Sequence, residues 1–100
     1  AYNQGPVLAL MHEAYAHDGR LATVDVVSYA LLFYGGRPVN MIGTYKFTGD
    51  PAALDHPGDA PLYVIAPLSR GPALLKAHPL LQPVRQEADL GLWVLPASRG

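Results

Sequence analysis

Residues 21–39 read LATVDVVSYALLFYGGRPV, and this stretch decides the fold. Residues 21–27 favour β-structure, and the apolar and aromatic segment 29–34 that follows predicts a short helix. Gly35-Gly36 ends this helix, because glycine takes the left-handed conformation that a helix end often requires. A second β run occupies residues 39–42. The stretch therefore predicts strand, short helix and strand, the centre of a small α/β sheet.

The segment before it, residues 5–19, has apolar residues at helical spacing and predicts an amphipathic helix. Pro6 suits the first helical turn, because its missing N–H would be unpaired there in any case. Gly19 is expected to end the helix. The face expected against the core consists of Val7, Leu8, Met11, Ala14 and Tyr15.

The second half of the chain predicts one long loop and the remaining elements. Residues 43–61 are rich in turn sequences, and residues 62–66 form the most apolar strand. A helix is expected at 71–77, and the runs 84–88 and 92–95 predict a β-hairpin whose first strand is exposed. The sequence therefore predicts an α/β fold: a small, mostly parallel sheet of about five strands, with helices packed on it and a C-terminal antiparallel hairpin.

Length and composition indicate one globular domain over residues 1–100. Half of the residues are hydrophobic and 15% are charged, which excludes a disordered chain. The formal net charge is −1 and no cluster of Lys and Arg is present, so nucleic acid is not an expected partner. The absence of cysteine excludes disulfides, thiolate metal sites and cysteine catalysis.

Four histidines raise the question of a metal site. His12 and His17 are five residues apart, off a shared helical face, whereas zinc-binding helices use a spacing of four. His56 and His78 each stand in turn sequence. Solvated surface positions account for these histidines better than ligation does, so neither a metal nor another cofactor is expected.

Candidate ligand contacts gather at the carboxyl edge of the predicted sheet, where ligands bind in open α/β folds. Asp25 ends the first strand, and a helix cap or a salt bridge to Arg37 is favoured over catalysis for it. Ser28 lacks the flanking glycines of a nucleophile elbow, so helix capping is favoured. Ser69 and Arg70 follow the strand at 62–66 and open a helix, whose free N–H groups favour an anion. Serine is also a routine helix cap, and no glycine-rich phosphate fingerprint is present.

Phe33-Tyr34 and Gly36-Arg37-Pro38-Val39 resemble a pattern found in bacterial membrane glycosyltransferases of the protein mannosyltransferase and lipid A aminoarabinose transferase type. In that family, a membrane part with many spans is followed by a small domain outside the cytoplasmic membrane. Leu62-Tyr63-Val64-Ile65 and Leu92-Trp93-Val94-Leu95 are similar to later strands of that domain. The resemblance therefore extends in order over most of the chain.

The resemblance implies that residues 1–100 are a soluble α/β domain of a larger membrane protein at the periplasmic face of the bacterial inner membrane. The parent protein would transfer a sugar from a polyprenyl-phosphate donor to a lipid or protein acceptor. Its catalytic carboxylates lie in loops between membrane helices, so no catalytic residue is expected here. The implied partners are the membrane-embedded part and the lipid-linked sugar phosphate.

Tyr45, Lys46 and Phe47, near the start of the 43–61 loop, are candidate contacts for either partner, because they combine aromatic rings with a cation. The alternative for this loop is a plain connector. For the whole chain, the alternatives are a free-standing module for a small anion, using Asp25, Ser28, Ser69 and Arg70, and a purely structural or interaction domain.

Overall fold

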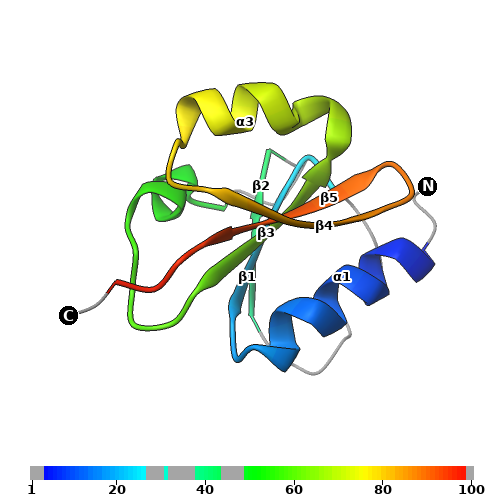
Figure 1. Cartoon of the computed structure of the whole chain (residues 1–100), viewed down its shortest axis with the longest axis horizontal. Coiled ribbons are helices and arrows are strands. Elements are labelled where there is room, and N and C mark those ends of the chain that lie inside the picture. The colour runs from blue at the N-terminus through cyan, green and yellow to red at the C-terminus, as the bar shows by residue number, and fades with distance from the viewer. Residues whose placement is uncertain (1–3, 27–30, 32–37, 44–48, 99–100) are drawn as a thin grey trace.

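The computed structural model describes residues 4–26, 31, 38–43 and 49–98. A five-stranded sheet forms its centre, with α1 packed on one face and α3 on the other (Figure 1). The elements in chain order are α1 (Gln4–Ala16), β1 (Arg20–Val24), β2 (Val39–Ile42), the 3-10 helix η1 (Pro51–Asp55), β3 (Leu62–Pro67), the 3-10 helix η2 (Leu68–Arg70), α3 (Gly71–Ala77), β4 (Gln82–Glu87) and β5 (Leu90–Leu95).

The sheet is mixed, and the prediction of a mostly parallel sheet is wrong. The strand order is β2-β1-β3-β5-β4. β1 pairs in parallel with β2 and with β3, over four residue pairs each. β5 pairs antiparallel with β3 over six residue pairs and with β4 over five, so the antiparallel ladders are longer. The α/β class, the five strands and the C-terminal hairpin are confirmed.

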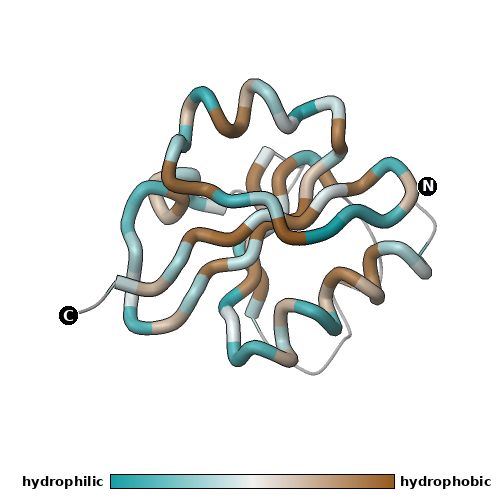
Figure 2. Tube along the Cα trace, in the orientation of Figure 1, coloured by the Kyte–Doolittle hydropathy of each residue, from teal (hydrophilic) through white to brown (hydrophobic). Residues whose placement is uncertain are grey.

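The polarity of the last two strands explains this arrangement. β5 is buried along nearly its whole length, whereas β4 is exposed along nearly its whole length. Figure 2 shows the same contrast, with β5 mostly hydrophobic and β4 mostly hydrophilic. Because an apolar strand is most stable with neighbours on both edges, the hairpin inserts β5 next to β3 and leaves β4 at the sheet edge.

Alternate residues of the strands supply two apolar layers, one on each face of the sheet. The layer under α1 consists mainly of Val7, Leu10, Met11 and Ala14 with Leu21, Tyr63, Ile65 and Leu92. The layer under α3 consists mainly of Leu54 and Leu74 with Ala22, Leu62, Val64, Trp93 and Leu95. The predicted apolar face of the first helix is thus confirmed, although Leu8 and Tyr15 are only partly buried.

The short helix expected at 29–34 lies outside the described residues, except for Leu31, which is helical and buried. Ser28, Tyr45, Lys46 and Phe47 also lie outside them. Their predicted structure and contacts therefore stay predictions.

The segment that follows β2 is tied back along that strand. Gly49 donates its N–H to the carbonyl of Met41 at 2.7 Å. The side-chain amide of Asn40 exchanges two hydrogen bonds of 3.0 Å with the backbone of Asp50. The Asp50 carboxylate then accepts the N–H of Ala52 and caps η1. These bonds fix η1 beside the edge of the sheet.

The end of α1 is a Schellman motif, and Asp18 rather than Gly19 takes the left-handed position. The N–H of Gly19 bonds the carbonyl of Ala14 at 3.1 Å, and that of Asp18 bonds the carbonyl of Tyr15 at 3.2 Å. Asp18 has φ 53°. The helix therefore ends at Ala16, before the expected end at Gly19, and the left-handed residue that follows it is Asp18.

Replacing Asp18 with glycine should raise the free energy of unfolding by about 0.5–1 kcal/mol, because glycine takes the left-handed conformation without steric cost. Urea denaturation would measure the change. Ala9→Gly, in the interior of the same helix, is the control and should lower stability by about 1 kcal/mol. A loss of stability in Asp18→Gly would contradict the account of this helix end.

Candidate functional site

The carboxyl ends of β1, β2 and β3 meet at one edge of the sheet, because these strands run parallel. Asp25 follows β1 directly, Gly43 follows β2, and η2 ending at Arg70 follows β3. β1 lies between β2 and β3 in the strand order, so Asp25 is the central residue of this edge. We refer to Asp25, Gly43, Ser69 and Arg70 as the strand-tip site.

An ion pair joins the two charged residues of the strand-tip site. The Nε atom of Arg70 lies 3.0 Å from Oδ2 of Asp25, and the side chains are 61% and 31% exposed. The favoured partner from the sequence was Arg37, which lies outside the described residues. The pair with Arg70 forms because β3 lies beside β1, which brings the segment after β3 to the tip of β1.

The backbone at this edge is shaped around the Asp25 carboxylate. Asp25 has φ 56°, a left-handed conformation that is uncommon for residues other than glycine, and its N–H bonds the Ile42 carbonyl at 3.0 Å. Gly43 also has a positive φ, of 74°, and a Cβ built on it would overlap Oδ1 of Asp25. Glycine at position 43 therefore leaves the space that the carboxylate occupies. Gly43 was not among the residues predicted for this site, although its position directly after a strand was a usable signal.

Ser69 does not have the predicted role of a helix cap. It lies within η2 and is exposed, and neither η2 nor α3 begins with a side-chain cap. α3 has seven residues and starts directly from η2, so the helix start expected to attract an anion is short. The anion contacts predicted for Ser69 and Arg70 stay predictions, and of these two residues Arg70 is the one that pairs with Asp25.

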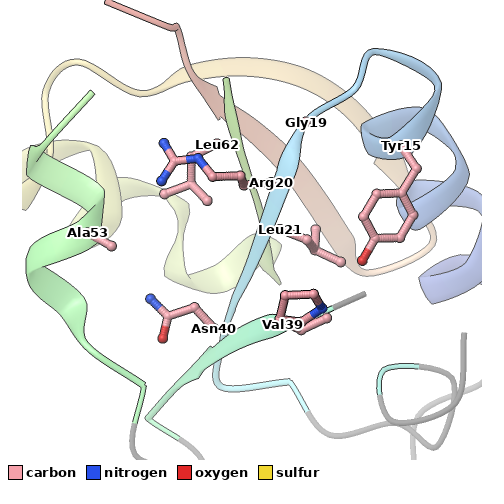
Figure 3. A pocket seen from close by; sticks show the side chains of 9 residues that line it. Tyr15, Gly19, Arg20, Leu21, Val39, Asn40, Ala53 and Leu62 are labelled. Carbon is pink, nitrogen blue, oxygen red and sulfur yellow. The ribbon is translucent and has the colours of Figure 1, made fainter. Parts of the chain in front are cut away.

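The amino ends of the same strands border a second feature, a groove of about 440 Å³ (Figure 3). Figure 3 shows Tyr15 on one side of β1 and Arg20 and Asn40 on the other. Arg20 donates from Nη2 to the carbonyl of Ala60 at 3.2 Å, and Asn40 is engaged with the backbone of Asp50. This groove could not be predicted from the sequence, because four separate segments line it.

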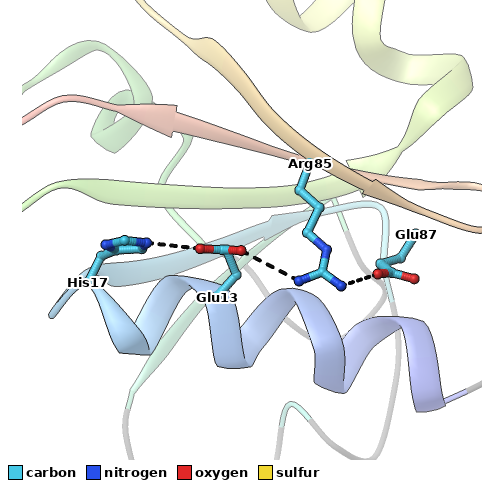
Figure 4. A network of polar contacts seen from close by, with 4 residues as sticks. All are labelled: Glu13, His17, Arg85 and Glu87. Carbon is cyan, nitrogen blue, oxygen red and sulfur yellow. Dashed lines mark hydrogen bonds and ion pairs between the residues drawn. The ribbon is translucent and has the colours of Figure 1, made fainter.

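A polar network links α1 to β4 (Figure 4). His17 Nε2 lies 2.9 Å from Glu13 Oε2, and Glu13 Oε1 lies 3.5 Å from Nη1 of Arg85. Nη2 of Arg85 also bonds Glu87. The hydrogen bond and the charge of Glu87 raise the pKa of Arg85 further, so the guanidinium stays charged. The network holds an exposed edge strand against the first helix.

Tyr63 lies beneath this network. Its ring stacks on His17, with ring centroids 6.1 Å apart. Burial, and to a lesser extent the charge of Glu13, raises the pKa of the Tyr63 phenol above its ordinary value. The unfolded chain then loses this proton more readily than the folded one, so stability falls as pH rises past about 10.

His78 is not the solvated histidine that the sequence predicts. Its Nδ1 lies 2.7 Å from Oδ1 of Asp55, and 17% of its side chain is exposed. This contact ties the end of α3 to η1. Across the residues with described positions, no group of three or more His, Asp and Glu side chains is arranged to hold a metal ion.

The strand-tip site is thus where predicted ligand contacts meet in space, and it contains an exposed cation held by a carboxylate. Within the described ranges, no helix has both the length and the apolar character needed to span a bilayer. Comparison of the chain with protein-family models, with curated proteins and with solved structures gives no match.

Proposed function

We propose that this chain is an accessory domain of a bacterial membrane glycosyltransferase, on the periplasmic face of the inner membrane. The parent enzyme transfers a sugar from a polyprenyl-phosphate donor to a lipid or protein acceptor. The observation that supports this proposal is where the resembling segments lie in the sheet. Val39 begins β2, residues 62–65 belong to β3 and residues 92–95 belong to β5. With β1, these strands are neighbours in one sheet.

In this proposal the domain supplies no catalytic group. The Asp25 carboxylate is engaged by Arg70, and catalysis belongs to the membrane-embedded part of the parent protein. The strand-tip site faces that part or the lipid-linked sugar phosphate. The contact predicted for Tyr45, Lys46 and Phe47 would lie on the same working side, because their loop leaves the carboxyl end of β2.

A transfer assay in membrane vesicles tests the proposal. Vesicles with the complete encoded protein should transfer sugar from a polyprenyl-phosphate donor, and the purified 100-residue chain should transfer none. Deleting this domain should lower the rate by roughly tenfold or more, because remote binding interactions contribute to catalysis. The amount of protein inserted in the membrane is the control for the deletion. Turnover by the purified chain alone would overturn the proposal.

A free-standing module for a small anion is the second candidate, and the exposed guanidinium of Arg70 favours it. A structural or interaction domain is the third, and it requires no ligand. The coding sequence upstream of Ala1 separates these candidates from the first. Several hydrophobic spans in the same reading frame would support the transferase, and a start codon at or near Ala1 would exclude it.

A further inference from the structure

We propose that Arg70 binds a phosphate group at the strand-tip site, and that Asp25 is a positioning residue that holds the Arg70 guanidinium in place. The ligand is the phosphate of a lipid carrier or of a small soluble molecule. This inference goes beyond the proposed function because it assigns the ligand chemistry and a role to each residue. It does not require a membrane-bound parent protein.

The first observation is the set of donors that Arg70 leaves available. Asp25 engages the guanidinium at Nε, with a distance of 3.0 Å to Oδ2. In the described part of the chain, Nη1 and Nη2 donate no hydrogen bond, and the side chain is largely exposed. A planar guanidinium with two available Nη atoms matches two oxygens of a phosphate.

The other arginines with described positions use these donors within the protein. Arg85 directs Nη1 to Glu13 and Nη2 to Glu87, so both of its Nη atoms face carboxylates (Figure 4). Arg20 directs Nη2 to the Ala60 carbonyl. Among the arginines with described positions, Arg70 is therefore the one whose Nη atoms both donate no hydrogen bond to the protein.

The second observation is that the residue holding Arg70 is itself held in an uncommon conformation. Asp25 has a left-handed backbone, its N–H is fixed by Ile42, and Gly43 leaves the space for its carboxylate. Backbone strain of this kind clusters at ligand-binding and catalytic sites. A guanidinium oriented in advance by such a residue loses less conformational freedom when it binds an anion.

The test is a titration of the isotope-labelled chain, followed through its amide chemical shifts at constant ionic strength. The probes are inorganic phosphate, farnesyl phosphate as a short isoprenyl phosphate, and farnesol as the phosphate-free control. We expect saturable shifts at Asp25, Gly43 and Arg70 with a dissociation constant of roughly millimolar. The expected affinity is low because a single exposed guanidinium contributes little binding energy. Farnesol should leave these amides unchanged.

Arg70→Lys keeps the positive charge but removes the planar guanidinium that can donate two parallel hydrogen bonds. It should therefore weaken phosphate binding by roughly tenfold. Arg85→Lys is the matched control, another exposed arginine in ion pairs, and it should bind like the parent chain. Equal binding by Arg70→Lys and the parent chain, or no saturable shift at these amides with either phosphate, would overturn the inference.

The positioning role of Asp25 has its own readout. Asp25→Ala should weaken phosphate binding by roughly threefold or more, although it removes a negative charge. Asp25→Asn retains an oxygen that can accept from Nε, so it should restore most of the affinity. An increase in affinity in Asp25→Ala would show that charge repulsion outweighs orientation, and the positioning role would be wrong. The dispersion of the amide spectrum reports whether each variant is folded.

The two phosphate probes separate the possible sources of the ligand. Farnesyl phosphate binding at least about tenfold more tightly than inorganic phosphate supports a lipid carrier, whereas equal binding supports a soluble phosphate. Phosphate binding without sugar transfer in vesicles would leave this inference standing and remove the proposed function. Sugar transfer in vesicles without phosphate binding at these residues would leave the proposed function standing and remove this inference.

Discussion

Replacing Trp93 with alanine should lower the free energy of unfolding by about 3–5 kcal/mol, as expected for truncation of a large aromatic side chain in a core. Trp93 is 5% exposed and lies in the layer under α3. Its indole packs against Gly71 and Gly91, and a Cβ at position 91 would overlap the ring. The surroundings are shaped to the indole, so a smaller side chain leaves a cavity. Small domains have a total stability of about 5–15 kcal/mol, so this loss is large.

Urea denaturation followed by far-ultraviolet circular dichroism would measure the effect without using tryptophan fluorescence. Leu80→Ala is the matched control, since Leu80 is 56% exposed and its truncation should change stability by no more than about 0.5 kcal/mol. Trp93→Phe retains part of the ring volume, so its loss of stability should lie between those of Trp93→Ala and Leu80→Ala. If Trp93→Ala behaves like Leu80→Ala, then the packing described for this layer is wrong.

Replacing Gly19 with alanine should lower the free energy of unfolding by about 1–3 kcal/mol, as overpacking does in a tightly packed region. A Cβ at position 19 would overlap two ring carbons of Tyr63 and lie 3.0 Å from the Ala14 carbonyl oxygen. Tyr63 is 7% exposed, so its ring has little room to move aside. Gly19 does not have a positive φ, so the expected cost is steric and does not come from backbone strain.

Gly58→Ala provides the control for this substitution. Its Cβ would meet only the end of the flexible Arg20 side chain, at 3.1 Å, so stability should change by no more than about 0.5 kcal/mol. The cost of Gly19→Ala should also shrink in a Tyr63→Leu background, because the two substitutions share one contact. An unchanged cost in that background would rule out the Tyr63 ring as the cause.

The helices and strands could be predicted wherever a local pattern determines them. Pro38 restricts where a strand can begin, and β2 has the predicted bounds, Val39–Ile42. The unbroken apolar run at 62–66 likewise predicted a buried strand, and β3 is that strand. The expectation that residues 21–42 form the centre of the sheet is wrong, because β3 is the central strand and β2 lies at an edge. The pairing of strands is a different matter, because it depends on segments far apart in the chain. The sequence pattern shows that the strand at 84–88 is exposed, but it does not show that β5 lies between β4 and β3.

The strand-tip site was predicted in part. Asp25 and Arg70 were both candidates, since each follows a strand, but their ion pair depends on β1 and β3 being neighbours. The salt bridge predicted between Asp25 and Arg37 stays a prediction, because Arg37 lies outside the described residues. The contacts His78–Asp55 and His17–Tyr63 could not be predicted, because each joins elements that are distant in sequence.

The segment tied along β2 also bears on how the domain avoids unwanted association. An open edge strand offers its backbone to strands of other molecules and can seed aggregation. At β2, the Met41 carbonyl is already bonded by Gly49, and the Asn40 side chain holds Asp50 beside the strand. A second chain could pair with this part of the edge only after displacing residues 49–50. The chain thus protects this part of the β2 edge with its own residues.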